Sequence, residues 1–208
     1  MNSSMNDNRS DCIYVLLTHT GTIFTTLIKL FTAAPYNHAS LALDADLNEM
    51  FSFGRKRAAN PFIAGFVEED VGEGTYRLFP NTRCKLLRLN VTRQQKENVE
   101  AFIRFLQRER DNYRYNLLGL LGVLLKRDLK LKNAYFCTQF VAETLRQSGI
   151  RLWERPSALV TPNDFLQHPD FEILYEGLLH HYPPVLHARM REARELQVSG
   201  FRFTKKVF

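Results

Sequence analysis

Tyr135-Phe136-Cys137-Thr138-Gln139-Phe140-Val141-Ala142 is the stretch around which the chain is organised. Apolar residues recur here at helical spacing and no Pro or Gly interrupts them before Gly149, which predicts a helix that Gly149 ends. Cys137 falls in its first turn, where unpaired N–H groups and the helix dipole stabilise a thiolate. Cys137 is therefore a candidate nucleophile, although its position beside Phe140 and Val141 is also typical of a buried core cysteine.

Length and composition indicate one domain, or one domain with appendages, and a sizeable core, since 45% of the 208 residues are hydrophobic. The polar N-terminus argues against a signal peptide, and the longest wholly apolar stretch, 117–125, is shorter than the roughly 20 residues of a membrane span. Three cysteines without paired short spacing give neither a disulfide framework nor a zinc pattern. We expect a reduced, cytoplasmic protein without cofactor or metal.

The formal net charge of +6 is compatible with a basic surface or with attraction to polyanions. The basic residues are scattered, and no basic stripe alternates with aromatic residues. Nucleic acid is therefore not the expected partner, because a basic pI alone is weak evidence for it.

Hydrophobic patterns predict strands and helices in mixed order. The predicted strands are 12–18, 38–44, 49–54, 62–67, 75–79, 85–91 and 172–176, of which 38–44 and 49–54 form a hairpin. The predicted helices are 22–32, 93–109 capped by Thr92, 113–125, a capped turn at 161–166, and 185–196 in the tail.

His38 opens its predicted strand, and together with Cys137 it supplies the two ingredients of a thiol–imidazole pair. A third polar group usually fixes the imidazole tautomer. Ser52 and Glu49 on the neighbouring strand are the candidates: Glu49 has the better charge, and Ser52 the better position if the hairpin turn is short. A lone strand histidine with a structural role is the competing interpretation.

Other polar groups have simpler explanations. The pattern at His180-His181 indicates a surface pair, because further metal ligands cannot be placed beside it. Asp44 and Asp46 fit the chemistry of a turn, and Glu68-Glu69-Asp70 is typical of a solvated acidic loop.

Three separated segments resemble a known family. They are 36–44 (Tyr-Asn-His-Ala-Ser-Leu-Ala-Leu-Asp), 49–55 (Glu-Met-Phe-Ser-Phe-Gly-Arg) and 135–142. They look like the circularly permuted branch of the NlpC/P60 papain-like superfamily, which includes the YiiX-like and the lecithin:retinol acyltransferase-like proteins. In the permuted order the histidine precedes the cysteine, as it does here. The resemblance covers roughly residues 12–180.

This resemblance implies an α+β, papain-like fold in which an antiparallel sheet packs against the helix that starts at Cys137. It implies Cys137 as nucleophile, His38 as base, and a third polar residue on the following strand, which maps best to Ser52. The implied chemistry is thiol-mediated acyl transfer: hydrolysis of peptide or isopeptide amides, or acyl exchange with lipids. The backbone N–H of Cys137 is expected in the oxyanion hole.

Residues and resemblance together predict a papain-like domain at 12–182 and a basic C-terminal extension at 183–208. The expected function is that of a cysteine peptidase, amidase or thiol acyltransferase, acting on a small amide, ester or peptide. The apolar stretches 22–32 and 117–125 leave a lipid substrate open, although core packing explains them equally well. The alternative is a non-catalytic binding module that keeps the fold, in which Cys137 is an ordinary thiol.

Overall fold

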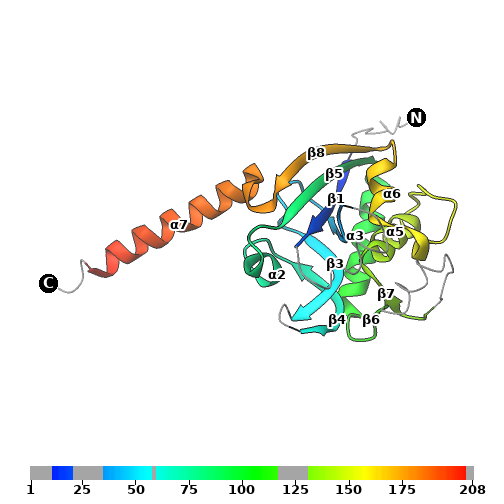
Figure 1. Ribbon diagram of the computed structural model, residues 1–208, viewed down its shortest axis with the longest axis horizontal. Helices are drawn as coiled ribbons and strands as arrows, with labels where there is room; N and C mark the ends of the chain where they lie inside the picture. The colour runs from blue at the N-terminus through cyan, green and yellow to red at the C-terminus, as the bar shows by residue number, and fades with distance from the viewer. Residues whose placement is uncertain (1–10, 21–34, 58–59, 117–130, 205–208) are drawn as a thin grey trace, which may run out of the picture.

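Strands from both halves of the chain form one antiparallel sheet. The computed structural model describes residues 11–20, 35–57, 60–116 and 131–204 (Figure 1). Within them the six-stranded sheet has the order β4-β3-β2-β1-β5-β8. The strands are β1 (Asp11–His19), β2 (His38–Ala42), β3 (Met50–Arg57), β4 (Asn60–Glu69), β5 (Arg83–Val91) and β8 (Phe171–Leu178). At this level the α+β prediction is confirmed.

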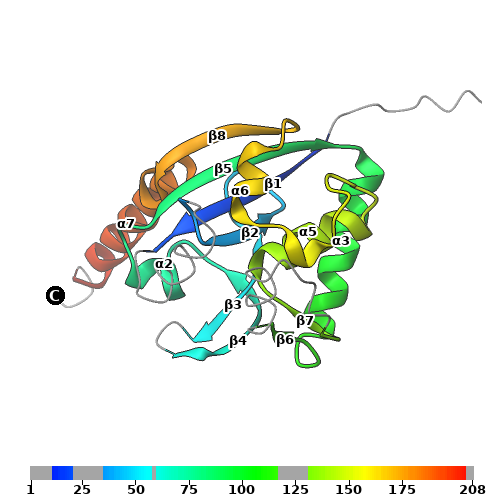
Figure 2. The same cartoon turned by 45° about the vertical axis from the view of Figure 1, so that its right-hand side comes forward.

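The helices lie on both sides of this sheet. They are α2 (Gly74–Leu78), α3 (Arg93–Arg108), α5 (Cys137–Gln147), α6 (Pro162–Gln167) and α7 (Pro183–Thr204), with the short 3₁₀ turns η1 (Ser157–Leu159) and η2 (Leu179–His181). Two short strands, β6 (Arg114–Tyr115) and β7 (Ala134–Tyr135), pair in parallel. Figure 2 shows α3 and α5 on one side of the sheet, and α2 and α7 on the other.

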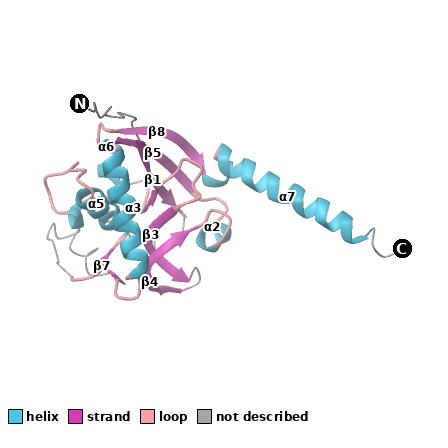
Figure 3. Ribbon diagram, turned by 180° about the vertical axis from the view of Figure 1, so that it is seen from behind, coloured by secondary structure: helices cyan, strands magenta, loops and turns pink. Residues whose placement is uncertain are grey.

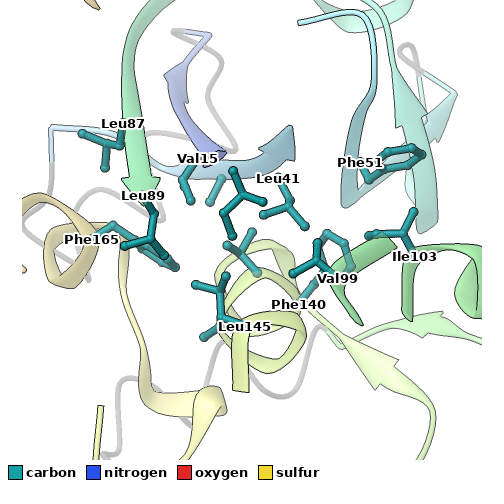
Figure 4. Packing of buried hydrophobic residues seen from close by; sticks show 14 of the residues in the cluster. Val15, Leu41, Phe51, Leu87, Leu89, Val99, Ile103, Phe140, Leu145 and Phe165 are labelled. Carbon is teal, nitrogen blue, oxygen red and sulfur yellow. The ribbon is translucent and has the colours of Figure 1, made fainter. Parts of the chain in front are cut away.

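The larger core lies between the sheet and the helices α3 and α5 (Figure 4). Alternate residues of the strands, such as Val15, Leu41 and Phe53, point to this side because successive side chains of a strand face opposite ways. The Phe140 ring of α5 packs 5.4 Å from the ring of Phe53, centroid to centroid. The helix that starts at Cys137 is thus anchored on the centre of the sheet.

A second, smaller core covers the opposite face. Leu16 and Met50 point to this side and meet Tyr76 of α2, Leu179 of η2 and Val185 in the first turn of α7. Because both faces are covered, β1 is buried on both sides, which explains its almost continuous apolar sequence. Beyond this first turn, α7 runs away from the sheet (Figure 3).

Helix α3 shows how local sequence sets an element. Thr92 Oγ1 accepts a hydrogen bond from the backbone N–H of Gln95, and Gln95 Oε1 accepts one from the N–H of Thr92. This reciprocal capping box satisfies two N–H groups that the first turn leaves unpaired. The buried residues Val99, Ile103 and Leu106 share the face that packs on the sheet.

Most predicted elements are confirmed, with small differences at their ends. The prediction of a strand at 75–79 is wrong, because these residues form most of α2. The helix predicted from residue 113 is wrong at its start, since Arg114 and Tyr115 form β6. The rest of that helix, from residue 117, and the helix predicted at 22–32 lie outside the described residues.

Among the described helices, none is both long enough and apolar enough to cross a lipid bilayer.

Candidate active site

Cys137 is the first residue of α5 and points toward the start of β2. The preceding residue, Phe136, has extended backbone angles, and its carbonyl accepts the first helical hydrogen bond from the N–H of Phe140 at 2.8 Å. The Cys137 sulfur accepts hydrogen bonds from the backbone N–H groups of Thr138 and Ala39 and is hydrogen-bonded to His38. Helix α5 and strand β2 therefore meet at the sulfur.

These contacts favour the thiolate form of Cys137. The side chain is buried, and burial by itself would favour the neutral thiol. The hydrogen bond and charge of His38, with the N–H groups of Ala39 and Thr138, outweigh burial and lower the pKa of Cys137 below its ordinary value. In Cys84, by contrast, burial raises the pKa of the thiol to about 12.

His38 is the first residue of β2 and lies between the sulfur and a carboxylate. Its Nε2 donates to Oε1 of Glu69 at 2.8 Å, so Nδ1 is the ring nitrogen left for Cys137. Burial favours the neutral ring, but the charges of Glu69 and Cys137 and their hydrogen bonds raise the pKa of His38 to about 10. The ring is therefore an imidazolium around neutral pH.

Glu69 ends β4 and is the most densely hydrogen-bonded carboxylate of the site. Besides the bond from His38, Oε1 accepts one from Ser52 at 2.6 Å, while Oε2 accepts from Ser40 at 2.5 Å and from the Tyr76 hydroxyl at 3.0 Å. Burial opposes ionisation, but the charge of His38 and these donors lower the pKa of Glu69 to about 2.

Glycine at position 54 leaves room for the imidazole. A Cβ at this position would lie 3.5 Å from Cε1 of His38 and only 3.2 Å from Oγ of Ser52. Gly54 follows Ser52 by two residues, so both belong to the same face of β3. A larger residue here would crowd the ring and the Ser52 hydroxyl together.

The structure brings Cys137, His38 and Ser52 together, as the sequence predicts. The side chain that bonds to the His38 imidazole, however, is neither Ser52 nor Glu49, the two residues predicted for that role. Ser52 is one hydrogen bond away from His38, because its hydroxyl donates to Glu69. Glu49 lies exposed at the hairpin turn, where its N–H donates to Asp44. In the described part of the chain, the carboxylate that bonds to His38 belongs to Glu69.

Sequence reasoning misses Glu69 because three acidic residues in a row look like a solvated loop. That interpretation is wrong for Glu69, which is the last residue of β4 and is paired with Met50 of β3. The sequence does contain a signal for Glu69. If the alternation of the strand predicted at 62–67 is continued to residue 69, Glu68 and Glu69 lie on opposite faces of the sheet. Glu68 accordingly bonds to Gln107 of α3, and Glu69 faces α2.

The other candidate groups do not form a further site. His180 is buried rather than exposed, and its Nε2 donates to the carbonyl of Tyr76, so the expected surface pair is wrong for this residue. Asp44 accepts hydrogen bonds from Asn48 and from the N–H of Glu49, which confirms its role in the turn. Within the described ranges, no three His, Cys, Asp or Glu side chains are grouped so that they could hold a metal ion.

The arrangement is a partly buried row of three ionisable groups: the thiol of Cys137, whose pKa is lowered, the imidazolium of His38 and the carboxylate of Glu69. Chemically it provides a nucleophile, a proton donor and acceptor beside it, and a group that fixes the ring. The chain matches no protein-family model and no curated protein.

Proposed function

We propose that the protein is a cysteine-dependent hydrolase or acyltransferase of papain-like, circularly permuted type. The observation that carries this proposal is the row Cys137–His38–Glu69, in which one buried thiol has a lowered pKa beside a protonated imidazole. A core cysteine needs neither partner. The packing of the cysteine-bearing helix on an antiparallel sheet, with the histidine on a strand earlier in the chain, supports the papain-like assignment.

In the proposed reaction the Cys137 sulfur attacks the carbonyl carbon of an amide or ester. An S–C bond forms, and the carbonyl electron pair moves to the oxygen, where the N–H of Cys137 at the helix start stabilises the charge. When the tetrahedral intermediate collapses, His38 gives its proton to the departing nitrogen or oxygen. The products of this half are a thioester on Cys137 and a free amine or alcohol.

In the second half an acceptor removes the acyl group. His38, now neutral, takes a proton from water or from another hydroxyl or amine, and the resulting nucleophile attacks the thioester. Glu69 stays ionised throughout and holds the ring by Nε2. Water as acceptor gives a hydrolase and a second nucleophile gives an acyltransferase. The proposed substrate is a peptide, isopeptide, small ester or lipid acyl group.

The deciding experiment is the alkylation rate of Cys137 by iodoacetamide against pH, in the wild type and in His38→Ala. Mass spectrometry of the peptides separates Cys137 from Cys12 and Cys84, which serve as internal references. We expect Cys137 to react well below about pH 8 in the wild type and to lose this reactivity without His38. Formation of a thioester on Cys137 with p-nitrophenyl esters is the accompanying test of chemistry.

An ordinary titration of Cys137, unchanged in His38→Ala, would contradict the proposal. The protein would then be better described as a binding module that keeps the fold, in which a change of Cys137 costs about 1 kcal/mol of packing and affects no reaction.

A further inference from the structure

Tyr76 reaches the candidate site from the face of the sheet opposite to α5. It lies in α2, its side chain is buried, and its hydroxyl donates to Oε2 of Glu69 at 3.0 Å. Helix α5, which begins at Cys137, packs on the other face through Phe140 and Val141. The carboxylate is therefore contacted by an element that has no part in holding the nucleophile.

The donors to Glu69 differ in how they are supported. His38 and Ser40 belong to β2, and Ser52 belongs to the adjacent strand β3, so the sheet itself fixes these three donors. Tyr76 comes from a helix of only five residues. So short a helix has little stability of its own, and packing must hold it in place.

The C-terminal part of the domain provides that packing. His180 in η2 is buried, and its Nε2 donates to the carbonyl oxygen of Tyr76 at 3.1 Å. Leu179, Tyr182 and Val185 belong to the same buried cluster as Tyr76. A continuous set of contacts thus runs from the base of α7 through Tyr76 to Glu69 and His38.

We propose that Tyr76 is a positioning residue, which holds the Glu69 carboxylate against His38 and is itself held in place by the segment from Leu179 to Val185. This inference rests on the proposed function, because the pair that it supports is the Cys137–His38 pair. It gives the C-terminal part of the domain a role in the chemistry although none of its described residues contacts the sulfur.

The physical effect of Tyr76 is to favour the ionised carboxylate. A hydroxyl that donates to a charged acceptor stabilises it more than it would a neutral one. The titratable groups at the carboxylate are His38 and Tyr76, with Cys137 beyond His38. Burial and the charge of Glu69 raise the pKa of Tyr76, so the hydroxyl keeps its proton. Without this donor the carboxylate is held less firmly against His38, so it stabilises the imidazolium less, and through His38 the thiolate is stabilised less as well.

The test compares Tyr76→Phe with Tyr182→Phe in the full chain. Both tyrosines are buried in the same cluster, but the Tyr182 hydroxyl donates to the carbonyl of Ala45 and not to Glu69. For Tyr76→Phe we expect the pH of half-maximal alkylation of Cys137 to rise by about half a unit to one unit. Tyr182→Phe keeps the wild-type profile. If the Tyr76 ring had only a packing role, Phe would fill the same space, and the pH profile of Cys137 alkylation would be unchanged in both variants.

A second pair of variants tests the C-terminal segment. His180→Phe removes the donor to Tyr76 but keeps a ring in the buried site, while His181→Ala changes the exposed neighbour. We expect His180→Phe to shift the alkylation profile in the same direction as Tyr76→Phe, and His181→Ala to leave it unchanged.

The outcomes separate this inference from the proposed function. If the wild type shows the low-pH, His38-dependent reactivity and Tyr76→Phe has the same profile, the role of Tyr76 is refuted and the proposed function stands. Equal shifts in Tyr76→Phe and Tyr182→Phe would also refute it, as a general packing effect. An unchanged profile in His180→Phe refutes the role of the C-terminal segment. If the wild-type thiol titrates ordinarily, both proposals fail together.

Discussion

At the scale of single residues, the candidate site depends on a partly buried imidazolium between the Cys137 sulfur and the Glu69 carboxylate. A buried charge is costly unless it is paired and hydrogen-bonded, and here each charge has both. His38 is paired with Glu69 on Nε2 and with Cys137 on the other side, and Glu69 has three hydroxyl donors in addition. Removal of one member leaves its neighbour partly buried without a counter-charge, so we expect substitutions here to affect the reactivity of Cys137 and the stability together.

Glu69→Gln tests the contribution of this charge to the thiolate. A neutral amide still contacts Nε2 but no longer favours the imidazolium, so the pKa of His38 falls and the thiolate loses its partner. We expect the pH of half-maximal alkylation of Cys137 to rise by about one unit or more. Glu68→Gln is the matched control, because Glu68 faces α3 and bonds to Gln107. Equal profiles for both variants would contradict the pairing.

The same carboxylate makes stability depend on pH. The pKa of Glu69 is lowered from 4.5 to about 2 in the folded chain, so its contribution is present above about pH 4.5 and is lost as the pH falls toward 2. We expect the difference in free energy of unfolding between wild type and Glu69→Gln to shrink by about 2 kcal/mol between about pH 6 and about pH 3. Urea unfolding at both values measures it. A constant difference would mean that the pKa of Glu69 is not lowered.

At this scale the sequence singles out Cys137 and His38, but not Glu69, the carboxylate that contacts His38. Cys137 carries its signal locally, at the start of a helix that Gly149 ends. His38 opens a strand in a readable hairpin. Glu69 becomes a partner of His38 only through the pairing of β3 with β4, which joins Met50 to Glu69. Local sequence does not specify that register, so the acidic run looks like a loop.

At the scale of elements, α5 must begin and end in fixed places, because its first turn carries Cys137. Gly149 follows the last turn with φ of +81°, and a Cβ there would meet none of the described atoms within 4 Å, so only the backbone conformation demands glycine. We expect Gly149→Ala to lower the free energy of unfolding by about 1 kcal/mol, and Gly149→Asn by less, since Asn tolerates this region. Urea unfolding checks both values. Equal costs for the two variants would contradict a purely conformational origin.

The elements that the sequence predicts well are those with strong local signals. Helix α3 has a capping box, and α6 has Pro162 in its first turn after Thr161. Helix α2 has no such signal: residues 75–79 are rich in strand-forming types, and their helical form depends on the burial of Tyr76 between the sheet and the C-terminal segment. Tertiary packing overrides local preference there, and a single sequence does not display it.

At the scale of the whole molecule, the sheet separates two layers that both serve the candidate site. The layer of α3 and α5 anchors the helix of Cys137 through the larger core, while α2, which packs with the base of α7 on the other side of the sheet, brings Tyr76 to Glu69 (Figure 2). The order of the strands puts β2, with His38, between β1 and β3 and away from both edges. The histidine is thus held by the most constrained part of the fold, and its partners approach it from the two sides.

Helix α7 has two parts that should differ in their effect on stability. Val185 in its first turn is buried in the smaller core, whereas Leu186 and Met190 are 41% and 48% exposed, and the helix then runs away from the body (Figure 3). We expect Val185→Ala to lower the free energy of unfolding by about 2 kcal/mol, and Leu186→Ala to change it by less than about 0.5 kcal/mol.

Removal of residues 191–208 should change the free energy of unfolding by less than about 1 kcal/mol, because the described side chains of α7 from Arg191 onward are exposed. Urea unfolding of the full chain, the truncated chain and the two point variants gives all the values under one condition. A truncation that costs as much as Val185→Ala would contradict this division. It would mean that the outer part of α7 is packed in solution, against the body or against a second copy, and a dependence of its cost on protein concentration would distinguish the two cases.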